Sequence, residues 1–133
     1  MRKLAILAVL TALLSGCVQN NIEVTTAPVR DASAFNKAKA LVADRMRDPE
    51  ATRFKPQYAA YKTSAGDLVV CGTLNGKNAM GGYVGYQPFY ARIRGNTLAA
   101  LQFPDGTDDY GMAANMVKQT CNEAASGKMK VSS

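Results

Sequence analysis

The chain of 133 residues is long enough for one domain with a modest core, and its formal net charge of +6 is scattered along the sequence. It contains three cysteines but neither a histidine nor a CxxC pair. This composition argues against a zinc site and removes the commonest general base. Because the basic residues form no clean stripe, a nucleic-acid-binding face is not expected either.

The first 17 residues have the organisation of a bacterial lipoprotein signal peptide. A positively charged start precedes an apolar run over residues 4–14, which is too short for a membrane-spanning helix of about 20 apolar residues. The next residues, LSGC at 14–17, closely resemble a lipobox. That resemblance implies removal of residues 1–16 and acylation of Cys17, and several acyl chains anchor a protein stably. The alternative is an ordinary secretory signal in which Cys17 is incidental.

Residues 17–31 are expected to carry the lipid on Cys17 and then to form a flexible linker. The stretch after the cysteine is polar, contains Pro28 and lacks helical periodicity. A short strand over 22–24 is the alternative. In similar lipoproteins an aspartate directly after the lipidated cysteine is typical of retention in the inner membrane, whereas here Val18 occupies that position. The resemblance therefore favours the outer membrane of a bacterial cell envelope, with the domain in the periplasm.

A helix is predicted over residues 32–47. Its apolar side chains recur at intervals of three and four, which places them on one face. These side chains are Phe35, Ala38, Leu41, Val42 and Met46. Asp31 or Ser33 can cap the start. Pro49 ends the helix, because a residue that precedes proline avoids the helical region.

The densest basic group follows this helix and consists of Arg45, Arg47, Arg53 and Lys55, interrupted by acidic residues at 44, 48 and 50. A solvated helix end explains the group better than a binding stripe. In that interpretation Arg45 and Arg47 lie in the last turn, where the helix dipole is negative. Mild attraction to anionic lipid headgroups or cell-wall polymers is the alternative.

A small antiparallel meander of three or four strands is predicted in the middle of the chain, where apolar or β-branched runs alternate with turn residues. The strands are expected at 58–62, 68–71, 83–94 and 97–103. A turn at 64–67 and a tight hairpin at Gly95-Asn96 connect them. Phe89, Ala91 and Ile93 should face one side of the sheet.

A second helix is predicted from Asp108 or Asp109 to about Ala125, and Gly127 marks its end. The side chains expected on its inner side are Met112, Met116, Val117, Thr120, Cys121 and Ala124. A polar tail over 128–133 follows.

Cysteine usage predicts one disulfide. With Cys17 assigned to lipid, Cys71 and Cys121 form an even pair in an oxidising compartment. The predicted fold class is therefore α+β, a single domain over 32–127. Its N-terminal helix precedes the meander, and its C-terminal helix is held to the sheet by the disulfide.

Two stretches in the middle of the chain carry a family resemblance. The first is DPEATRF at 48–54, and the second runs from Cys71 to Phe89 as CGTLNGKNAMGGYVGYQPF. Together they resemble a family of small exported bacterial and phage-associated proteins with the pattern DPxSxxF and CGxxNxxNxxGGYxGxxxF. Ala51 and Thr52 depart from the first part. The resemblance covers about residues 44–93 and implies a fold unit and a disulfide, with no established activity.

The glycine-rich segment 72–86 supplies the candidate binding residues Asn75, Asn78, Tyr83 and Tyr86. Asparagine side chains hydrogen-bond the backbone of their own loop, so the simpler interpretation is a structured connection between two strands. The functional interpretation is a recognition loop that presents the two tyrosines. On a regular strand one tyrosine should be buried and the other exposed, unless Gly85 introduces a bulge.

Little in the sequence supports catalysis, and neither a catalytic residue nor a metal or cofactor is expected. Asp105, Asp108 and Asp109 form the only acidic cluster, and a turn followed by a helix N-cap explains them. The expected role is a non-enzymatic interaction or structural role in the cell envelope. Its partners would be the membrane, through Cys17, and an envelope protein. The alternative is inhibition of a cell-wall hydrolase by the segment 72–86.

Overall fold

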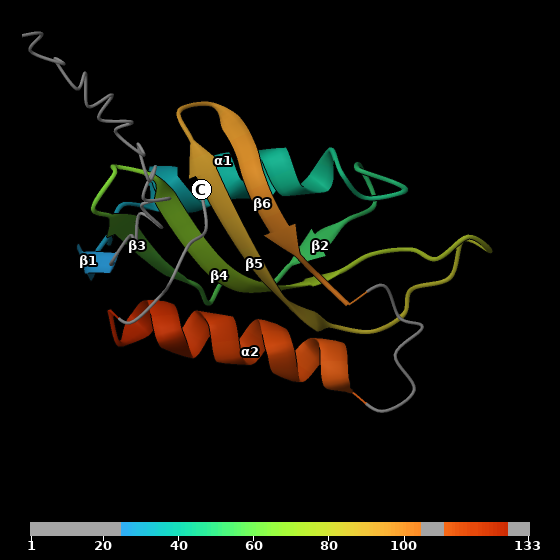
Figure 1. The fold of residues 1–133 in the computed structure, drawn as a ribbon. Coiled ribbons are helices and arrows are strands. Elements are labelled where there is room, and N and C mark those ends of the chain that lie inside the picture. Colours follow the sequence, from blue (N-terminus) through green and yellow to red (C-terminus); the bar gives the residue numbers. More distant parts are fainter. Residues whose placement is uncertain (1–24, 105–110, 128–133) are drawn as a thin grey trace, which may run out of the picture.

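A computed structural model of the protein describes residues 25–104 and 111–127 (Figure 1). The expected signal peptide, the expected lipidation site Cys17 and the start of the expected linker lie outside the described residues. So do Asp105, Asp108, Asp109 and the tail 128–133. The remaining expected elements fall on residues that the structure describes.

An antiparallel sheet forms the centre of the domain. Its strands lie in the order β1-β3-β4-β5-β6, and β2 pairs with the end of β4. The strands are β1 (Thr25–Pro28), β2 (Arg53–Phe54), β3 (Ala59–Thr63), β4 (Leu68–Asn75), β5 (Gln87–Arg94) and β6 (Thr97–Gln102). The helices are α1 (Ala32–Ala43) and α2 (Met112–Ala125). The predicted α+β class and the four-stranded meander from β3 to β6 are confirmed.

Two short strands extend this meander beyond the predicted three or four. Strand β1 pairs with β3 through Thr25 opposite Thr63, so the prediction of a linker up to residue 31 is wrong for residues 25–28. Local polarity suggested a linker, but the edge of β3 supplies backbone partners, and an edge strand tolerates Pro28. Strand β2 pairs with the last two residues of β4.

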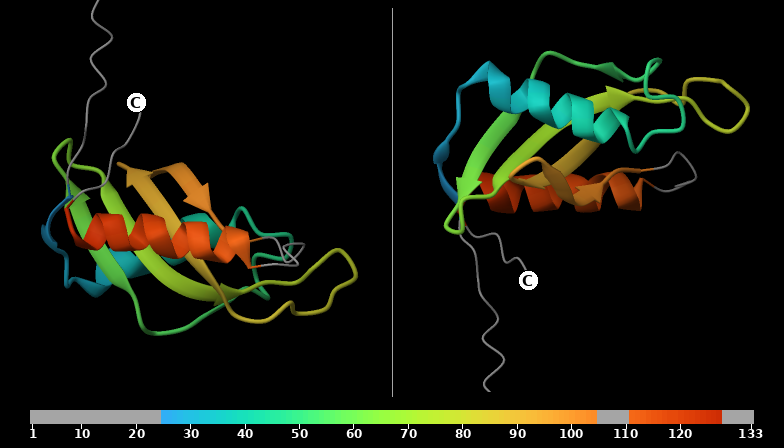
Figure 2. Two further views of the ribbon diagram at one scale, coloured as in Figure 1. Left: turned by 60° about the horizontal axis from the view of Figure 1, so that its bottom comes forward. Right: turned by 90° about the horizontal axis from the view of Figure 1, so that it is seen from above.

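The two helices cover opposite faces of the sheet, which therefore lies between them (Figure 2). Helix α1 packs Phe35 and Val42 against the face that carries Phe89. Ala91 and Ile93 belong to the same cluster, as the alternation along the strand predicts. Helix α2 packs Val117 and Ala124 against the other face, where Tyr90 is buried. Burial on both faces explains why the central strands β4 and β5 are apolar over most of their length.

Helix α1 is shorter than predicted. The Asp31 cap is confirmed, because the Ser33 amide donates a hydrogen bond to its Oδ1 at 2.9 Å. The helix ends at Ala43 and not at residue 47. Beyond it the amides of Arg45 and Met46 bond carbonyls only three residues back, which tightens the turn and ends the α-helical pattern. The predicted place of Arg45 and Arg47 in the last turn is therefore wrong, and both lie in a loop.

Helix α2 also differs from its prediction at the N-terminus. It begins at Met112 with Gly111 at the N-cap position, where φ is 68° and no side chain caps the helix. Met112 and Met116 are exposed, so their prediction as inner side chains is wrong. Val117, Cys121 and Ala124 define a narrower packing stripe, because 100° per residue carries both methionines well away from it. Gly127 follows the helix with φ of 72°, as expected for its end.

The Cys71–Cys121 disulfide is confirmed and joins β4 to α2, with the two Cα atoms 6.0 Å apart. It closes a loop with a sequence separation of 50 residues. It fixes the C-terminal helix on the sheet midway along β4.

One end of the sheet, which we call the turn end, consists of residues 63–68 and the beginning of β1. It holds a buried ion cluster. Asp67 is buried and accepts hydrogen bonds from Arg92 Nε at 2.7 Å and from Arg94 Nε at 3.1 Å. The hydrogen bonds from Arg94, followed by those from Arg92, hold the pKa of Asp67 below its usual value against the opposing effect of burial. The cluster satisfies charges that would otherwise destabilise the fold.

Candidate functional site

The opposite end of the sheet, which we call the loop end, brings together residues 44–55 and 75–86. Strand β4 runs towards it and β5 runs away from it, and the connection between them projects beyond the sheet (Figure 1). The chain after α1 and the short strand β2 lie beside this connection. The two stretches of the family-like pattern, 48–54 and 71–89, thus meet at one place.

Asparagine side chains hold the projecting loop together. Asn75 Oδ1 accepts a hydrogen bond from the Gly85 amide at 3.0 Å. Asn78 Oδ1 accepts two, from the amides of Met80 and Gly82, each at 3.0 Å. The backbones of Asn78 and Gly82 bond at 2.8 Å. The predicted structured connection with amide locks is therefore confirmed.

Tyr83 ties this loop to the segment before β2. Its hydroxyl donates a hydrogen bond to the Ala51 carbonyl at 2.8 Å. The Arg53 guanidinium lies 4.5 Å from the centre of its ring and the Lys77 ammonium 5.7 Å from it. Although 38% of Tyr83 is exposed, its hydroxyl is already bonded to Ala51, and Lys77 beside its ring is paired with Asp48. Tyr83 therefore serves mainly to position the loop.

Tyr86 is the more available of the two tyrosines. It is 45% exposed, and the Lys55 ammonium lies 4.9 Å from its ring centre. Both tyrosines are exposed, so the predicted exception at Gly85 applies, and residues 84–86 do not form a regular strand. Gly85 has φ of +99°, which L side chains rarely adopt and which breaks the alternation between Tyr83 and Tyr86.

A surface ion pair joins the two segments of the loop end. Lys77 Nζ lies 3.2 Å from Asp48 Oδ2, and the Ala51 amide donates to Asp48 Oδ1 at 3.1 Å. The hydrogen bond from Lys77, then the one from the Ala51 amide, lowers the pKa of Asp48. The carboxylate at position 48 thus shapes the turn that precedes β2 and holds Lys77 beside it.

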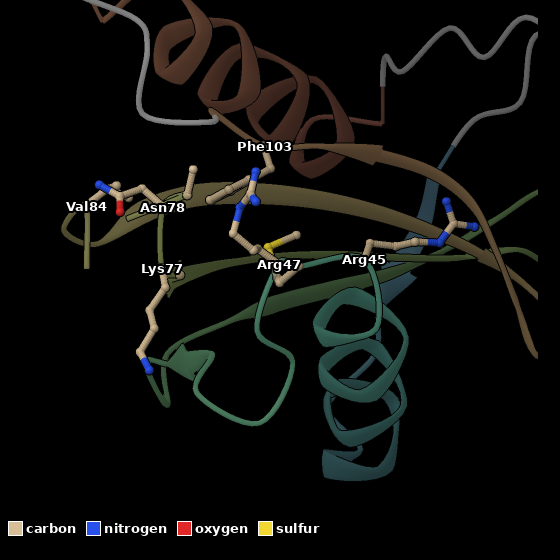
Figure 3. Close-up of a pocket in the computed structure, with 9 residues that line it drawn as sticks. Arg45, Arg47, Lys77, Asn78, Val84 and Phe103 are labelled. Carbon is tan, nitrogen blue, oxygen red and sulfur yellow. The ribbon is translucent and has the colours of Figure 1, made fainter. Parts of the chain in front are cut away.

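A cleft of about 420 Å³ opens next to the loop, between the chain that follows α1 and the beginning of the projecting connection (Figure 3). We call it the arginine cleft. Three cations line it, Arg45, Arg47 and Lys77, and its apolar wall consists of Met46, Val84 and Phe103. None of the described lining residues is acidic. The guanidinium groups of Arg45 and Arg47 form no ion pair or hydrogen bond within residues 25–104 and 111–127.

Figure 3 shows that the cations of the arginine cleft do not converge on one point. Arg47 reaches towards Phe103, whereas the side chains of Arg45 and Lys77 point to opposite sides. A single small anion would contact one of them at a time. An elongated ligand with several anionic groups fits the arrangement better.

The sequence identified Asn75, Asn78, Tyr83 and Tyr86, and the structure places all four at the loop end. Sequence reasoning missed Met80, which is 95% exposed at the tip of the loop. It noted the basic residues after α1 but interpreted them as a solvated helix end. The pairing of β2 with β4, which carries Arg53 and Lys55 to the tyrosines, was the missing information.

Within the described ranges, no three cysteine, aspartate or glutamate side chains lie close enough to hold a metal ion. No helix of these same residues is long and apolar enough to cross a membrane. The acidic residues 105, 108 and 109 fall in the gap between the ranges, although the prediction that they cap α2 is wrong because Gly111 holds that position.

Comparison with known protein families, characterised proteins and solved structures finds no match for this chain. The family-like pattern over residues 44–93 therefore stays a prediction from the sequence, and the functional argument depends on the geometry of the loop end.

Proposed function

We propose that this protein is a lipid-anchored component of the bacterial cell envelope with a non-enzymatic role, in which the loop end binds an envelope partner. The LSGC stretch and the apolar run before it support lipidation of Cys17. Val18 after the cysteine supports placement in the outer membrane, with the domain in the periplasm. No catalytic residue is assigned.

One observation carries the binding role: a loop fastened by its own asparagines holds Met80 and Tyr86 exposed to solvent. Exposed tyrosine and methionine side chains are frequent anchors at interfaces. Because the loop is already ordered, a partner would not have to supply the entropy of ordering it. The rigid framework of β4 and β5 carries this loop in the way that binding loops are usually carried.

The anchor is tested at its cysteine. Mass spectrometry of the protein from membranes should find an acylated Cys17 at the mature N-terminus. Cys17→Ser should leave an unprocessed precursor that lacks acyl chains, because lipidation of the sulfur precedes cleavage in lipoproteins of this kind. An unmodified mature N-terminus at Val18 or later would contradict the anchor.

The binding role is tested by placing a photo-cross-linking residue at Met80 in the full chain in living cells. Ala65, which is exposed in the turn between β3 and β4 at the opposite end of the sheet, is the matched control. A covalent adduct from position 80 and none from position 65 is expected. Adducts that are absent at 80, or equal at both positions, would contradict a binding role of the loop end.

The projecting tip also favours the second candidate, inhibition of a cell-wall hydrolase, because an exposed apolar residue on a fastened loop suits insertion into a cleft. In this interpretation the purified protein should slow the solubilisation of cell walls by hydrolases extracted from the same cells. Met80→Lys should abolish the effect and Ala65→Lys should retain it. An unchanged rate with the wild-type protein would remove this candidate.

A further inference from the structure

We infer that the arginine cleft binds the carboxylate-bearing peptides of the cell wall, peptidoglycan, on the side of the domain that faces away from the anchoring membrane. The inference depends on the proposed function, because the direction in which the cleft faces follows from lipidation of Cys17. It adds a partner of defined chemistry and names Arg45 and Arg47 as the residues that bind it.

The orientation follows from the strand register. Thr25, the first residue of β1, lies opposite Thr63, at the turn end. Strand β4 then runs eight residues, about 25 Å, from Leu68 at the turn end to Asn75 at the loop end. A lipid on Cys17 would be separated from β1 by residues 18–24 alone, which span at most about 25 Å. The anchor thus attaches at the turn end, and the arginine cleft opens at the other end of the domain.

The lining of the cleft selects an anionic ligand. Arg45 and Arg47 are exposed and have no acidic partner within the described ranges, whereas Lys77 is shared with Asp48. Asp48 and Glu50 line a neighbouring hollow, not the arginine cleft itself. Guanidinium groups pair with carboxylates through two parallel hydrogen bonds, which strengthens such contacts relative to lysine. The local charge therefore complements a ligand rich in carboxylates.

The shape of the cleft selects an elongated ligand with small apolar parts. Its cations point in different directions, and Met46, Val84 and Phe103 form an apolar wall between them. Its volume is within the range for a small ligand or a few residues of peptide. Stem peptides of the cell wall alternate small aliphatic and carboxylate-bearing residues and repeat along a polymer. Several copies anchored in one membrane would bind successive repeats, and their weak contacts would add up to firm attachment.

The test measures sedimentation of the mature, lipidated protein in detergent with purified, insoluble peptidoglycan. Wild-type protein should co-sediment, and the bound fraction should fall as salt is raised. Arg47→Glu should weaken binding by about tenfold, as expected for the loss of one charge-assisted contact. Arg30→Glu makes the same change of charge just after β1, beside Ala59 and Ala60 and outside the arginine cleft, and should leave binding within about twofold of wild type. Thermal unfolding of both variants confirms that they fold.

Chemical amidation of the peptidoglycan carboxylates identifies the recognised group, and wild-type protein should no longer co-sediment with the amidated polymer. Equal losses in Arg47→Glu and Arg30→Glu would indicate attraction by net charge alone and would overturn the inference. Absence of co-sedimentation together with an adduct from position 80 would overturn the inference and leave the proposed binding role intact. Absence of both would overturn both.

Discussion

At the turn end of the sheet, Asp67 is buried between Arg92 and Arg94, whereas at the loop end Arg53, Lys55 and Lys77 lie against half-exposed tyrosine rings. The turn end pairs this carboxylate and both guanidinium groups with one another. The loop end leaves two further arginines without acidic partners in the described part of the chain. Charge therefore contributes to folding at one end of the domain and remains available for binding at the other.

The disulfide lies between the two ends, and its removal should destabilise the domain strongly. Cys71→Ala with Cys121→Ala should lower the free energy of unfolding by about 4 kcal/mol, since the bond closes a loop of about 50 residues in the unfolded chain. Denaturant unfolding of oxidised wild type and the double variant measures the difference. Peptide mapping without reductant should find the bond itself, and two free thiols in protein from the envelope would contradict its assignment.

At the turn end, Asp67→Asn should lower the free energy of unfolding by about 3 kcal/mol. The change leaves the buried Arg92 without its carboxylate, but the Arg94 side chain is 61% exposed and can turn to solvent, which places the loss at the low end for buried pairs. At the loop end, Asp48→Asn is the matched control. Its ion pair with Lys77 is at the surface, so its loss should be much smaller. Similar losses for both variants would contradict the contrast between the two ends.

The same contrast should appear in the dependence of stability on pH. The pKa of Asp67 is lower in the folded protein than in the unfolded chain, chiefly because of the hydrogen bonds from Arg94. Its stabilising contribution is therefore complete above the unfolded pKa of about 4 and is lost as pH falls through the folded pKa. Denaturant unfolding should be measured from pH 6 down to the lowest pH at which both proteins still fold. Wild type should lose more stability over this range than Asp67→Asn. Parallel curves would show that Asp67 does not carry this dependence.

The sequence predicted the features of this molecule that depend on local pattern. Alternation placed Phe89 and Ile93 on one face of the sheet, which α1 covers. The asparagines at 75 and 78 predicted a loop that hydrogen-bonds its own backbone. It missed the features that depend on pairing between distant segments. Nothing local marks Arg53–Phe54 as a strand, because two residues carry no period and the pairing with β4 alone defines them.

The exposure of the tyrosines could be predicted only conditionally. One buried and one exposed ring required a regular strand from residue 83 onward, with Gly85 as the possible break, and the strand begins at Gln87. Whether Gly85 adopts a positive φ is visible only in the folded backbone. Likewise, the sequence left attraction to anionic polymers as the alternative for the basic residues after α1, but only the folded chain places Arg45 and Arg47 next to the loop and Phe103.

The smallest expected change in stability, and the sharpest test of the comparison, comes from Tyr86→Ala at the loop end. Tyr86 is 45% exposed, and its ring lies against the Lys55 ammonium. The free energy of unfolding should therefore fall by about 1 kcal/mol or less in the variant. Phe89→Ala, three residues further along the chain, removes a fully buried ring from the core and should cost about 3–5 kcal/mol. Denaturant unfolding gives both values, and cross-linking from position 80 gives the binding. If Tyr86 binds the partner, the adduct from position 80 should disappear in Tyr86→Ala while the protein keeps near-native stability. If Tyr86 only fills space, the variant should be less stable but should still form the adduct.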